Sequence, residues 1–242
     1  MFKNNRLLKY KRVILKLSGE SLINLKNKNN IDSFFLNFLS QEIKKIVDLN
    51  VELGIVIGAG NLFRGQQLQK IGFNRVIADQ IGILSTIING LAINNFMNQM
   101  HIKTLLMSSI PLNGICETYN WNRAIKFLSQ KNVIIFSAGI GNPFFTTDSA
   151  ACLRAIEIKA DIVLKGTQVD GVYTSDPKKN LEAKLYSQLS YKTVLKKELK
   201  VMDLSAFILA RDYNLPIRIF NIRKPNSLLR IVQGLNEGTL IH

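Results

Sequence analysis

Short glycine-containing loops follow several apolar runs of the chain, and they are the segments best suited to chemistry. Two of them are Gly58-Ala59-Gly60 and Gly139-Ile140-Gly141, and two more carry a lysine, Lys16-Leu17-Ser18-Gly19 and Lys165-Gly166. Glycine lets the backbone approach an anion closely, so that N–H groups can point at phosphate oxygens. One such loop alone is usually only a turn. Four of them at strand ends indicate a site for two anionic ligands, or for a polyphosphate and an acceptor.

Charged side chains beside these loops suit the handling of phosphate. Lys16 and Lys165 stand at strand ends, where an ammonium group can offset charge on a transferred group, although an edge lysine reaching solvent is the alternative. Arg64 can hold a phosphate bidentately, and a surface arginine is nearly as good an interpretation. Asp148 follows Thr146-Thr147 at a predicted helix start, where a simple capping acid is also plausible. Because phosphoryl transfer depends mainly on positioning and charge neutralisation, this inventory favours a phosphate-handling enzyme.

The sequence lacks the other common nucleotide-binding and catalytic motifs. It has no GxxxxGK[ST] loop. The GxGxxG fingerprint also fails, because Phe63 and Phe144 occupy the sixth positions of the segments that start at Gly58 and Gly139. Two cysteines and two histidines do not form a disulfide framework or a zinc motif. We therefore expect no dedicated metal site made by the protein alone.

The net charge of +15 admits two interpretations. A basic surface can bind nucleic acid or a membrane. The lysines are scattered singly or in pairs, which favours instead an enzyme for anionic substrates that requires no nucleic acid. We find no signal peptide and expect no apolar window of about 18 residues, so we expect no membrane span and a cytoplasmic protein.

The elements that must position these residues alternate between strands and helices. Strands are predicted at 12–17, 53–57, 102–108, 133–136, 162–164 and 217–222, with an edge strand at 238–241. Helices are predicted at 32–49, 75–100, 121–130, 148–159 and 204–212. Apolar strands separated by helices predict a mostly parallel sheet covered on both faces. We expect a single domain over residues 1–242, with residues 1–10 as a disordered tail.

Longer motifs cover the chain from residue 10 to about residue 241. They are YKRVILKLSGESL, GIVIGAGNLFRG, the stretch from SSIPLNGIC, SAGIGNPFFTTDSAACLRAIEI, DIVLKGTQVDGVYTSDP and KELKVMDLSAFILARDYNLPIRIFN. Through them the chain resembles the bacterial uridylate kinases of the amino acid kinase family, and the GNPFFTTDSAA block is the most discriminating part. The resemblance implies a three-layer α/β/α sandwich with a mostly parallel central sheet. It also implies transfer of the γ-phosphate of ATP to UMP, giving UDP and ADP in pyrimidine nucleotide biosynthesis. Mg²⁺ would be held mainly through the ATP phosphates, and the assembly would be a homohexamer built from dimers.

The resemblance further assigns roles to individual residues. Those implied at the transferred phosphate are Lys16, Arg64, Asp148, Lys165 and Asp203. Those implied at ATP are Lys16, Leu17, Ser18, Gly19, Gly60, Arg64, Thr167, Tyr173 and Asp176. Those implied at UMP are Ala59, Asp79, Ile140, Gly141, Asn142, Pro143, Phe144, Phe145, Thr146 and Thr147. Asp79 would bind the ribose and Thr147 would lie near the base. Ala59 stands where relatives often have glycine, and its backbone N–H survives that change.

Two alternatives stay open at this point. The same fold hosts kinases that phosphorylate a carboxylate or a carbamate, so the fold alone does not identify the acceptor. Against this alternative, the chain lacks the appended regulatory domain common in aspartate kinases and carries the aromatic-threonine loop from Phe144 to Thr147. A nucleic-acid-binding role could coexist with an enzyme, and it predicts an affinity that falls steeply with salt.

Overall fold

The computed structural model describes residues 8–24, 30–177, 179–180, 182–199 and 201–242. A single sheet in the order β4-β3-β5-β2-β1-β6-β8-β9-β7 runs through these residues. Its strands are β1 (Arg12–Leu17), β2 (Glu52–Ile57), β3 (Thr104–Ser108), β4 (Glu117–Thr118), β5 (Val133–Ser137), β6 (Ile162–Thr167), β7 (Gln188–Leu189), β8 (Ile217–Asn221) and β9 (Thr239–Ile241). All pairings are parallel except that between β8 and β9. The predicted mostly parallel sheet is therefore confirmed.

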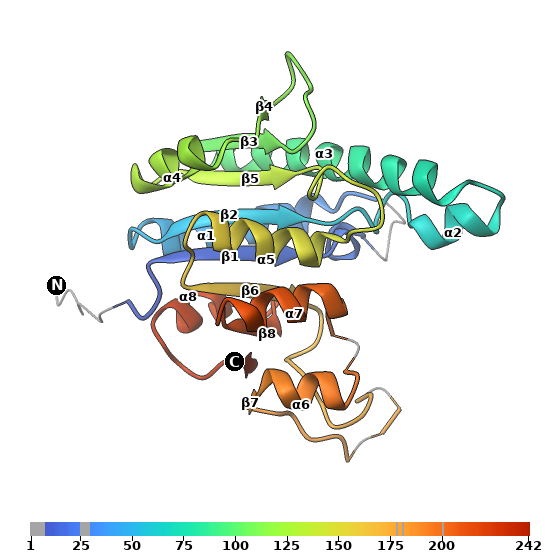
Figure 1. Ribbon diagram of the computed structural model, residues 1–242. Coiled ribbons are helices and arrows are strands. Elements are labelled where there is room, and N and C mark those ends of the chain that lie inside the picture. The colour runs from blue at the N-terminus through green and yellow to red at the C-terminus, as the bar shows by residue number, and fades with distance from the viewer. Residues whose placement is uncertain (1–7, 25–29, 178, 181, 200) are drawn as a thin grey trace, which may run out of the picture.

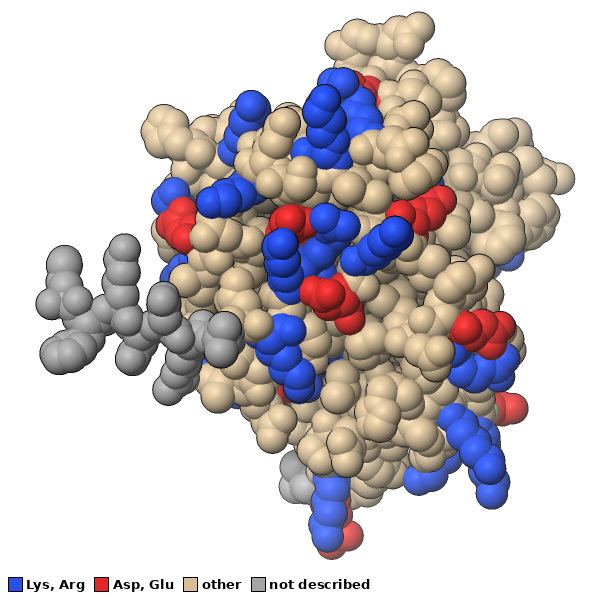
Figure 2. Space-filling view, turned by 60° about the vertical axis from the view of Figure 1, so that its left-hand side comes forward, with Lys and Arg blue, Asp and Glu red and all other residues tan. Residues whose placement is uncertain are grey.

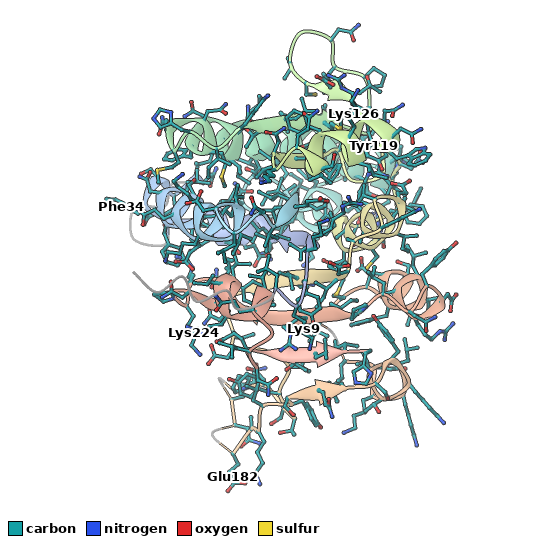
Figure 3. The ribbon with its side chains drawn as sticks, turned by 90° about the vertical axis from the view of Figure 1, so that its left-hand side faces the viewer. Lys9, Phe34, Tyr119, Lys126, Glu182 and Lys224 are labelled. Atoms are coloured by element: carbon teal, nitrogen blue, oxygen red, sulfur yellow. The ribbon has the colours of Figure 1, made fainter. Side chains whose placement is uncertain are left out.

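Helices cover both faces of this sheet. They are α1 (Ser33–Val47), α2 (Gly65–Lys70), α3 (Arg75–Gln99), α4 (Trp121–Ser129), α5 (Thr147–Glu157), α6 (Tyr191–Lys196), α7 (Leu204–Asp212) and α8 (Ser227–Val232). One apolar core joins α1, α3 and α8 to one face, and a second joins α4, α5, α6 and α7 to the other. Figure 3 shows the first layer on the side of Phe34 and the second on the side of Tyr119 and Lys126. The arrangement is the predicted three-layer α/β/α sandwich.

Burial on both faces explains the composition of the central strands. Every residue of β2 and of β5 is buried, and both strands consist mainly of Ile, Val, Leu and Phe. Strands of a parallel sheet covered on both sides are apolar throughout rather than alternating. The carboxyl ends of the central strands share one edge of the sheet, on the side where α2 lies in Figure 1.

The long helix α3 corrects one expectation from the sequence. Its 25 residues are long and apolar enough to cross a membrane by length and composition alone, although no such segment was expected. The reason is that α3 contains six Ile residues and two Leu residues, and its charged residues are limited to Arg75 and Asp79 in its first two turns. In the fold α3 packs on β3, β5 and α1, and its inner residues Ile93 and Met97 are completely buried. The helix is therefore a layer of the sandwich.

The remaining differences concern short elements and the chain start. Sequence patterns do not predict the short elements α2, α6, α8, β4, β7 and the 3₁₀ helix at Gly19–Leu22, each of which has six residues or fewer. Most of the expected tail of residues 1–10 lies outside the described residues. Tyr10, however, is buried, and Lys9 donates its backbone N–H to the carbonyl of Val232. The fold therefore begins before the predicted boundary.

Candidate functional site

A cavity of about 370 Å³ opens at the carboxyl ends of the central strands. Its lining joins the loops after β1, β2 and β5 to the first half of α3. The lining residues are Lys16, Ser18, Gly19, Glu20, Gly58, Ala59, Gly60, Phe63, Arg64, Gly65, Ala78, Asp79, Gly82, Ile83, Thr86, Gly139, Ile140, Asn142, Phe145, Thr146 and Thr147. Three of the four glycine loops expected from the sequence thus meet at one place.

The first two loops touch each other so closely that one position requires glycine. A Cβ atom on Gly19 would lie 2.5 Å from the backbone nitrogen of Gly60 and 2.8 Å from the carbonyl carbon of Ala59. These are backbone atoms, which cannot move aside as the end of a side chain can. The glycine of the first loop therefore serves close packing of two loops at the cavity as well as access to its own N–H.

The fourth loop differs from the expectation. Strand β6 continues to Thr167, so Lys165 and Gly166 lie within the strand rather than after it. A Cβ atom on Gly166 would meet Leu17 and Ile222 at 3.0 Å, which shows that this glycine serves core packing. Lys165 nevertheless reaches the site, because it pairs with Lys16 in the parallel register of β1 and β6.

A carboxylate bridges the two lysines. The Nζ atom of Lys16 lies 2.6 Å from Oδ1 of Asp148, and Nζ of Lys165 donates a 2.7 Å hydrogen bond to Oδ2. All three side chains are at least 88% buried, with exposed fractions of 8%, 12% and 10% for Lys16, Lys165 and Asp148. Asp148 is brought there by the first turn of α5, whose start is capped by the hydroxyl of Thr146. Two cations and one anion thus leave a net positive charge at the base of the site.

The environment of this trio shifts two of its pKa values. Burial opposes ionisation of Asp148, but the charges of Lys16 and Lys165 and their contacts outweigh it and lower the pKa of this carboxyl. Burial, followed by repulsion from Lys16, lowers the pKa of Lys165, and Asp148 partly counteracts both effects. Asp148 is therefore ionised at neutral pH, and its charge helps Lys165 to stay protonated.

A second acid, Asp203, stands beside the trio at the start of α7. Its carboxylate makes no capping hydrogen bond to that helix, and its Oδ2 atom is buried without a hydrogen-bond partner among the described residues. Burial, and then the negative charge of Asp148, raise the pKa of Asp203. A carboxylate held in this way is a costly feature, which suits an oxygen ligand for a cation rather than a structural contact.

Arg64 is not a free surface arginine. One of its terminal nitrogens lies 2.6 Å from Oε1 of Glu20, and both side chains are about half exposed, at 48% each. Both residues line the cavity. The sequence reasoning missed Glu20, although it lies in the same SGES motif as the first glycine loop.

The third loop is tied to α3 by Asp79. The Oδ2 atom of Asp79 accepts hydrogen bonds from the backbone N–H of Phe144, at 2.8 Å, and from Nε of Arg75, at 2.7 Å. The Arg75 guanidinium lies 5.3 Å from the centre of the Phe144 ring. Asp79 therefore lies at the cavity, as the sequence predicted, and also fixes the loop that closes one side of it.

Other predicted site residues are not part of the lining of this cavity. Leu17, Gly141, Pro143 and Phe144 are neighbours of lining residues but are not part of its lining, and the same holds for Asp148, Lys165 and Asp203. Thr167 is the last residue of β6, Tyr173 and Asp176 lie in the segment that follows this strand, and all three are outside the lining. Thr167 donates its hydroxyl to the carbonyl of Val169, and Tyr173 forms an isolated bridge with Leu185.

The chain is similar to known proteins over nearly its whole length. The family model described as "Amino acid kinase family" matches residues 11–221. A protein named uridylate kinase from Buchnera aphidicola subsp. Schizaphis graminum is 61% identical over 232 residues, covering 96% of each chain. One of the same name from Yersinia enterocolitica is 56% identical and covers 96% of this chain and 93% of its own. Among solved structures, UMP kinase from Bacillus anthracis has a TM-score of 0.93 at 45% identity, covering 96% of each chain. UMP kinase from Ureaplasma parvum has a TM-score of 0.90 at 36% identity, covering 97% of this chain and 99% of its own.

Proposed function

The chain belongs to the amino acid kinase family, and on this basis we propose that it is a nucleoside monophosphate kinase that transfers the γ-phosphate of ATP to UMP. The products are UDP and ADP, a step of pyrimidine nucleotide biosynthesis. The observation that carries the proposal most directly is the buried Lys16–Asp148–Lys165 trio beside glycine loops that converge on one cavity.

The lysines act on the phosphoryl group during transfer. A loose transition state spreads negative charge over the phosphoryl oxygens, and fixed cations in a water-poor site stabilise it strongly. Asp148 holds Lys16 and Lys165 side by side and helps Lys165 to stay protonated, so the two side chains need no reorganisation during the reaction. Asp148 acts here as an organiser of the two cations and not as a proton acceptor.

Arg64 acts where the donor and acceptor phosphates meet. Its guanidinium can bind phosphate oxygens bidentately once its ion pair with Glu20 is broken. Backbone N–H groups of Ser18, Gly19, Ala59 and Gly60 surround the same region and serve the phosphates of the two nucleotides.

UMP occupies the part of the cavity between α3 and the loop from Ile140 to Thr147. The carboxylate of Asp79 accepts hydrogen bonds from the ribose hydroxyls, and Thr147 lies toward the base. Phe145 and Ile140 supply apolar contact for the pyrimidine ring. The start of α5 faces this region, and its N–H groups favour an anion such as the acceptor phosphate.

ATP approaches from the side of the segment after β6. Thr167, Tyr173 and Asp176 line the nucleoside part of its site, and Lys165 and Asp203 lie toward its phosphates. This placement is supported by the register that sets Lys165 beside Lys16, since the donor phosphates must reach both ammonium groups.

The residues present fit Mg²⁺ held mainly through the ATP phosphates. No group of three or more potential protein ligands occurs among the described residues, so the chain itself supplies no complete cage there. Asp203 offers one buried carboxylate oxygen without a partner in the described structure, which is the donor type that Mg²⁺ prefers. When bound, the ion neutralises charge on the polyphosphate.

The proposal is tested by incubating the purified protein with ATP, Mg²⁺ and UMP and following ADP release with a coupled assay. We expect UMP-dependent turnover, with CMP a poor acceptor and aspartate and carbamate inactive. Lys16→Ala should lower turnover about a hundredfold or more. Lys45→Ala is a matched control, because Lys45 also pairs with a buried carboxylate, that of Glu42, but lies on α1 outside the cavity lining. Absence of UMP-dependent turnover in the unaltered protein would refute the assignment.

The protein acts as a homo-oligomer, with a hexamer built from dimers as the specific assembly. The support is an apolar stripe on the outer side of α3, where Ile77, Leu84, Ile88 and Leu91 are 40–49% exposed. Their spacings of seven, four and three residues place them on one helix face. Light scattering should show that Ile88→Glu lowers the mass of the particle, whereas Leu235→Glu, at an exposed leucine elsewhere, leaves it unchanged.

A cytoplasmic location and independence from nucleic acid complete the proposal. Lys and Arg side chains are interleaved with Asp and Glu on the face shown in Figure 2, rather than gathered into a continuous basic stripe. A nucleic-acid site would need such a stripe to neutralise successive phosphates. DNA affinity measured at physiological salt should accordingly be weak, and a steep decline with rising salt would argue for a separate nucleic-acid role.

A further inference from the structure

The inner face of α3 contacts the loops of the cavity at points that no sequence motif indicates. We propose that Thr86 and Asn89 are positioning residues: together they hold the phosphate loop after β2 and the acceptor loop after β5 at a fixed separation. The inference rests on the function proposed above and adds two residues to it. Its basis is a set of buried hydrogen bonds from one helix to two loops.

Asn89 contacts the phosphate loop through a reciprocal pair of amides. Its Nδ2 donates to Oδ1 of Asn61 at 2.7 Å, and Nδ2 of Asn61 donates back to Oδ1 of Asn89 at 2.9 Å. Asn89 Nδ2 also donates to the carbonyl of Gly58 at 2.8 Å, and Asn61 Nδ2 donates to the carbonyl of Asn30 at 2.8 Å. Asn89 is completely buried and Asn61 is 6% exposed. All four side-chain N–H groups of the pair are therefore used.

The amide pair lies directly beneath the junction of the two phosphate loops. A Cβ atom on Gly19 would approach Oδ1 of Asn61 to 2.6 Å, so the pair supports the loop after β1 as well as the one after β2. A buried and fully satisfied polar network has one favourable geometry, unlike an apolar contact that tolerates sliding. This specificity is what a loop needs if its N–H groups must stay aimed at phosphate oxygens.

Thr86 makes the corresponding contact to the acceptor loop. Its hydroxyl accepts the backbone N–H of Ala138 at 2.7 Å and donates to the carbonyl of Ile83 at 2.7 Å. Ala138 has a φ of +64°, a left-handed conformation that is unfavourable for a residue with a side chain. Gly139, the next residue, also has a positive φ, of 54°. The hydrogen bond from Ala138 thus holds the turn at which the acceptor loop leaves β5.

The spacing along α3 sets the geometry of the whole site. Thr86 and Asn89 are three residues apart and share one helix face, about 4.5 Å apart along the axis at 1.5 Å per residue. Asp79, two turns earlier, holds the far end of the acceptor loop through the N–H of Phe144. One rigid helix therefore fixes both loops. A substitution at Thr86 should affect binding of the acceptor, UMP, whereas a substitution at Asn89 should affect the alignment of the phosphate groups.

The experiment compares substitutions at these two positions with one at their neighbour. Ser85 is the matched control, because it is 2% exposed and its hydroxyl donates to the carbonyl of Ile81 within α3 itself, with no hydrogen bond to a loop among the described residues. We expect Thr86→Val to raise the KM for UMP about tenfold while the KM for ATP stays within about twofold. Thr86→Ser, which keeps the hydroxyl, should restore the KM for UMP. Asn89→Ala should lower kcat about tenfold or more with little change in the KM for UMP, and Ser85→Ala should change neither.

Amide hydrogen exchange gives a readout that does not depend on the activity. The N–H of Ala138 should exchange at least tenfold faster in Thr86→Val than in the unaltered protein and in Ser85→Ala. If the unaltered protein shows no UMP-dependent turnover, the proposed function fails, and the exchange rates still decide whether Thr86 holds the loop. The inference would be overturned if the N–H of Ala138 exchanged at an unchanged rate in Thr86→Val. It would also be overturned if Thr86→Val and Ser85→Ala raised the KM for UMP and the KM for ATP by the same factor.

Discussion

Replacing Asp148 with Asn tests the role of the bridging carboxylate most sharply. The substitution keeps the shape of the side chain and the Thr146 cap of α5, but it removes the negative charge that pairs with both Lys16 and Lys165. At the observed separations of 2.6 and 2.7 Å, Coulomb's law with an effective dielectric constant of about 20 gives about 6 kcal/mol of attraction for each pair. The cost of burying the charges offsets much of this energy. Breaking a buried pair by removing one partner costs about 3–5 kcal/mol, and we expect that loss in the free energy of unfolding.

The destabilisation should depend on pH in a defined direction. The folded-state pKa of Asp148 is lowered, so its stabilising contribution is present above the unfolded pKa of about 3.9 and is lost as pH falls through the folded value. The stability gap between the unaltered protein and Asp148→Asn should therefore be full at neutral pH and close in acid. Urea unfolding at a series of pH values measures it.

The kinetic consequences involve Lys165. Its pKa is already lowered by burial and by Lys16, and Asp148 is the group that opposes this. In Asp148→Asn the pKa of Lys165 should fall further. The alkaline limb of the pH–rate profile, where activity is lost as pH rises, should therefore shift to lower pH. We expect kcat at neutral pH to drop about a hundredfold or more, as for other groups that stabilise transition-state charge.

A matched control and an added polyanion separate this reasoning from general damage. Glu52→Gln breaks another buried ion pair, that of Glu52 with Arg12, which lies outside the cavity lining. It should lose stability without shifting the alkaline limb of the rate profile. Pyrophosphate should raise the Tm of Asp148→Asn more than that of the unaltered protein or of Glu52→Gln, because it replaces the missing negative charge. A normal alkaline limb together with near-normal kcat in Asp148→Asn would refute the organising role of this carboxylate.

Four further substitutions test other parts of the site. Asp203→Asn should raise the Tm at pH 7 and lower turnover. The folded-state pKa of Asp203 is raised, so ionisation of this carboxyl destabilises the fold at a pH above that pKa, and the gain in Tm should disappear near pH 4. Gly19→Ala should destabilise the fold by about 1–3 kcal/mol and raise the KM for ATP, because the added Cβ lies 2.5 Å from the backbone nitrogen of Gly60. Gly82→Ala is the control: its Cβ enters open space, so thermal unfolding should show a gain in stability of about 0.5–1 kcal/mol. Asp79→Asn should raise the KM for UMP with little change in kcat, and an unchanged KM for UMP would exclude its ribose contact.

The sequence was sufficient to predict the layers of the fold because burial leaves a clear pattern. Strands β2 and β5 are buried along their whole length and consist mainly of apolar residues, as two-sided coverage favours, and the long helices carry apolar faces. The short elements went unpredicted for the opposite reason. Helix α8 begins after Asn226 in a left-handed conformation without a side-chain cap, so no N-cap signal marks its start. Strands β4 and β7 have two residues each, too few for a pattern, and they are strands because they pair with β3 and β9.

The site was predictable where it follows from the parallel sheet and unpredictable where it depends on contacts distant in sequence. Carboxyl ends of parallel strands share an edge, so the loops at Gly19, Gly58 and Gly139 were correctly expected to meet. Gly166 followed the same sequence pattern but lies inside β6, because the strand continues beyond the apolar run used to predict its end. Thr86 and Asn89 lie in the middle of a helix, where Thr and Asn carry no motif, and only their loop partners 28 to 52 residues away reveal them.

Ion pairing within the site explains why the net charge was a poor guide to function. The bridging carboxylate pairs with both buried lysines, and Arg64 pairs with Glu20, so three cations of the site face carboxylates of the same chain. A phosphate that binds here must exchange these partners, and its affinity depends on the geometry of the exchange more than on the +15 charge of the chain. The Arg64–Glu20 pair is half exposed and cheap to break, whereas the buried trio is costly to disturb. Arg64 is therefore suited to capture phosphate as the substrates enter, and the two lysines are suited to stay fixed while the phosphoryl group passes.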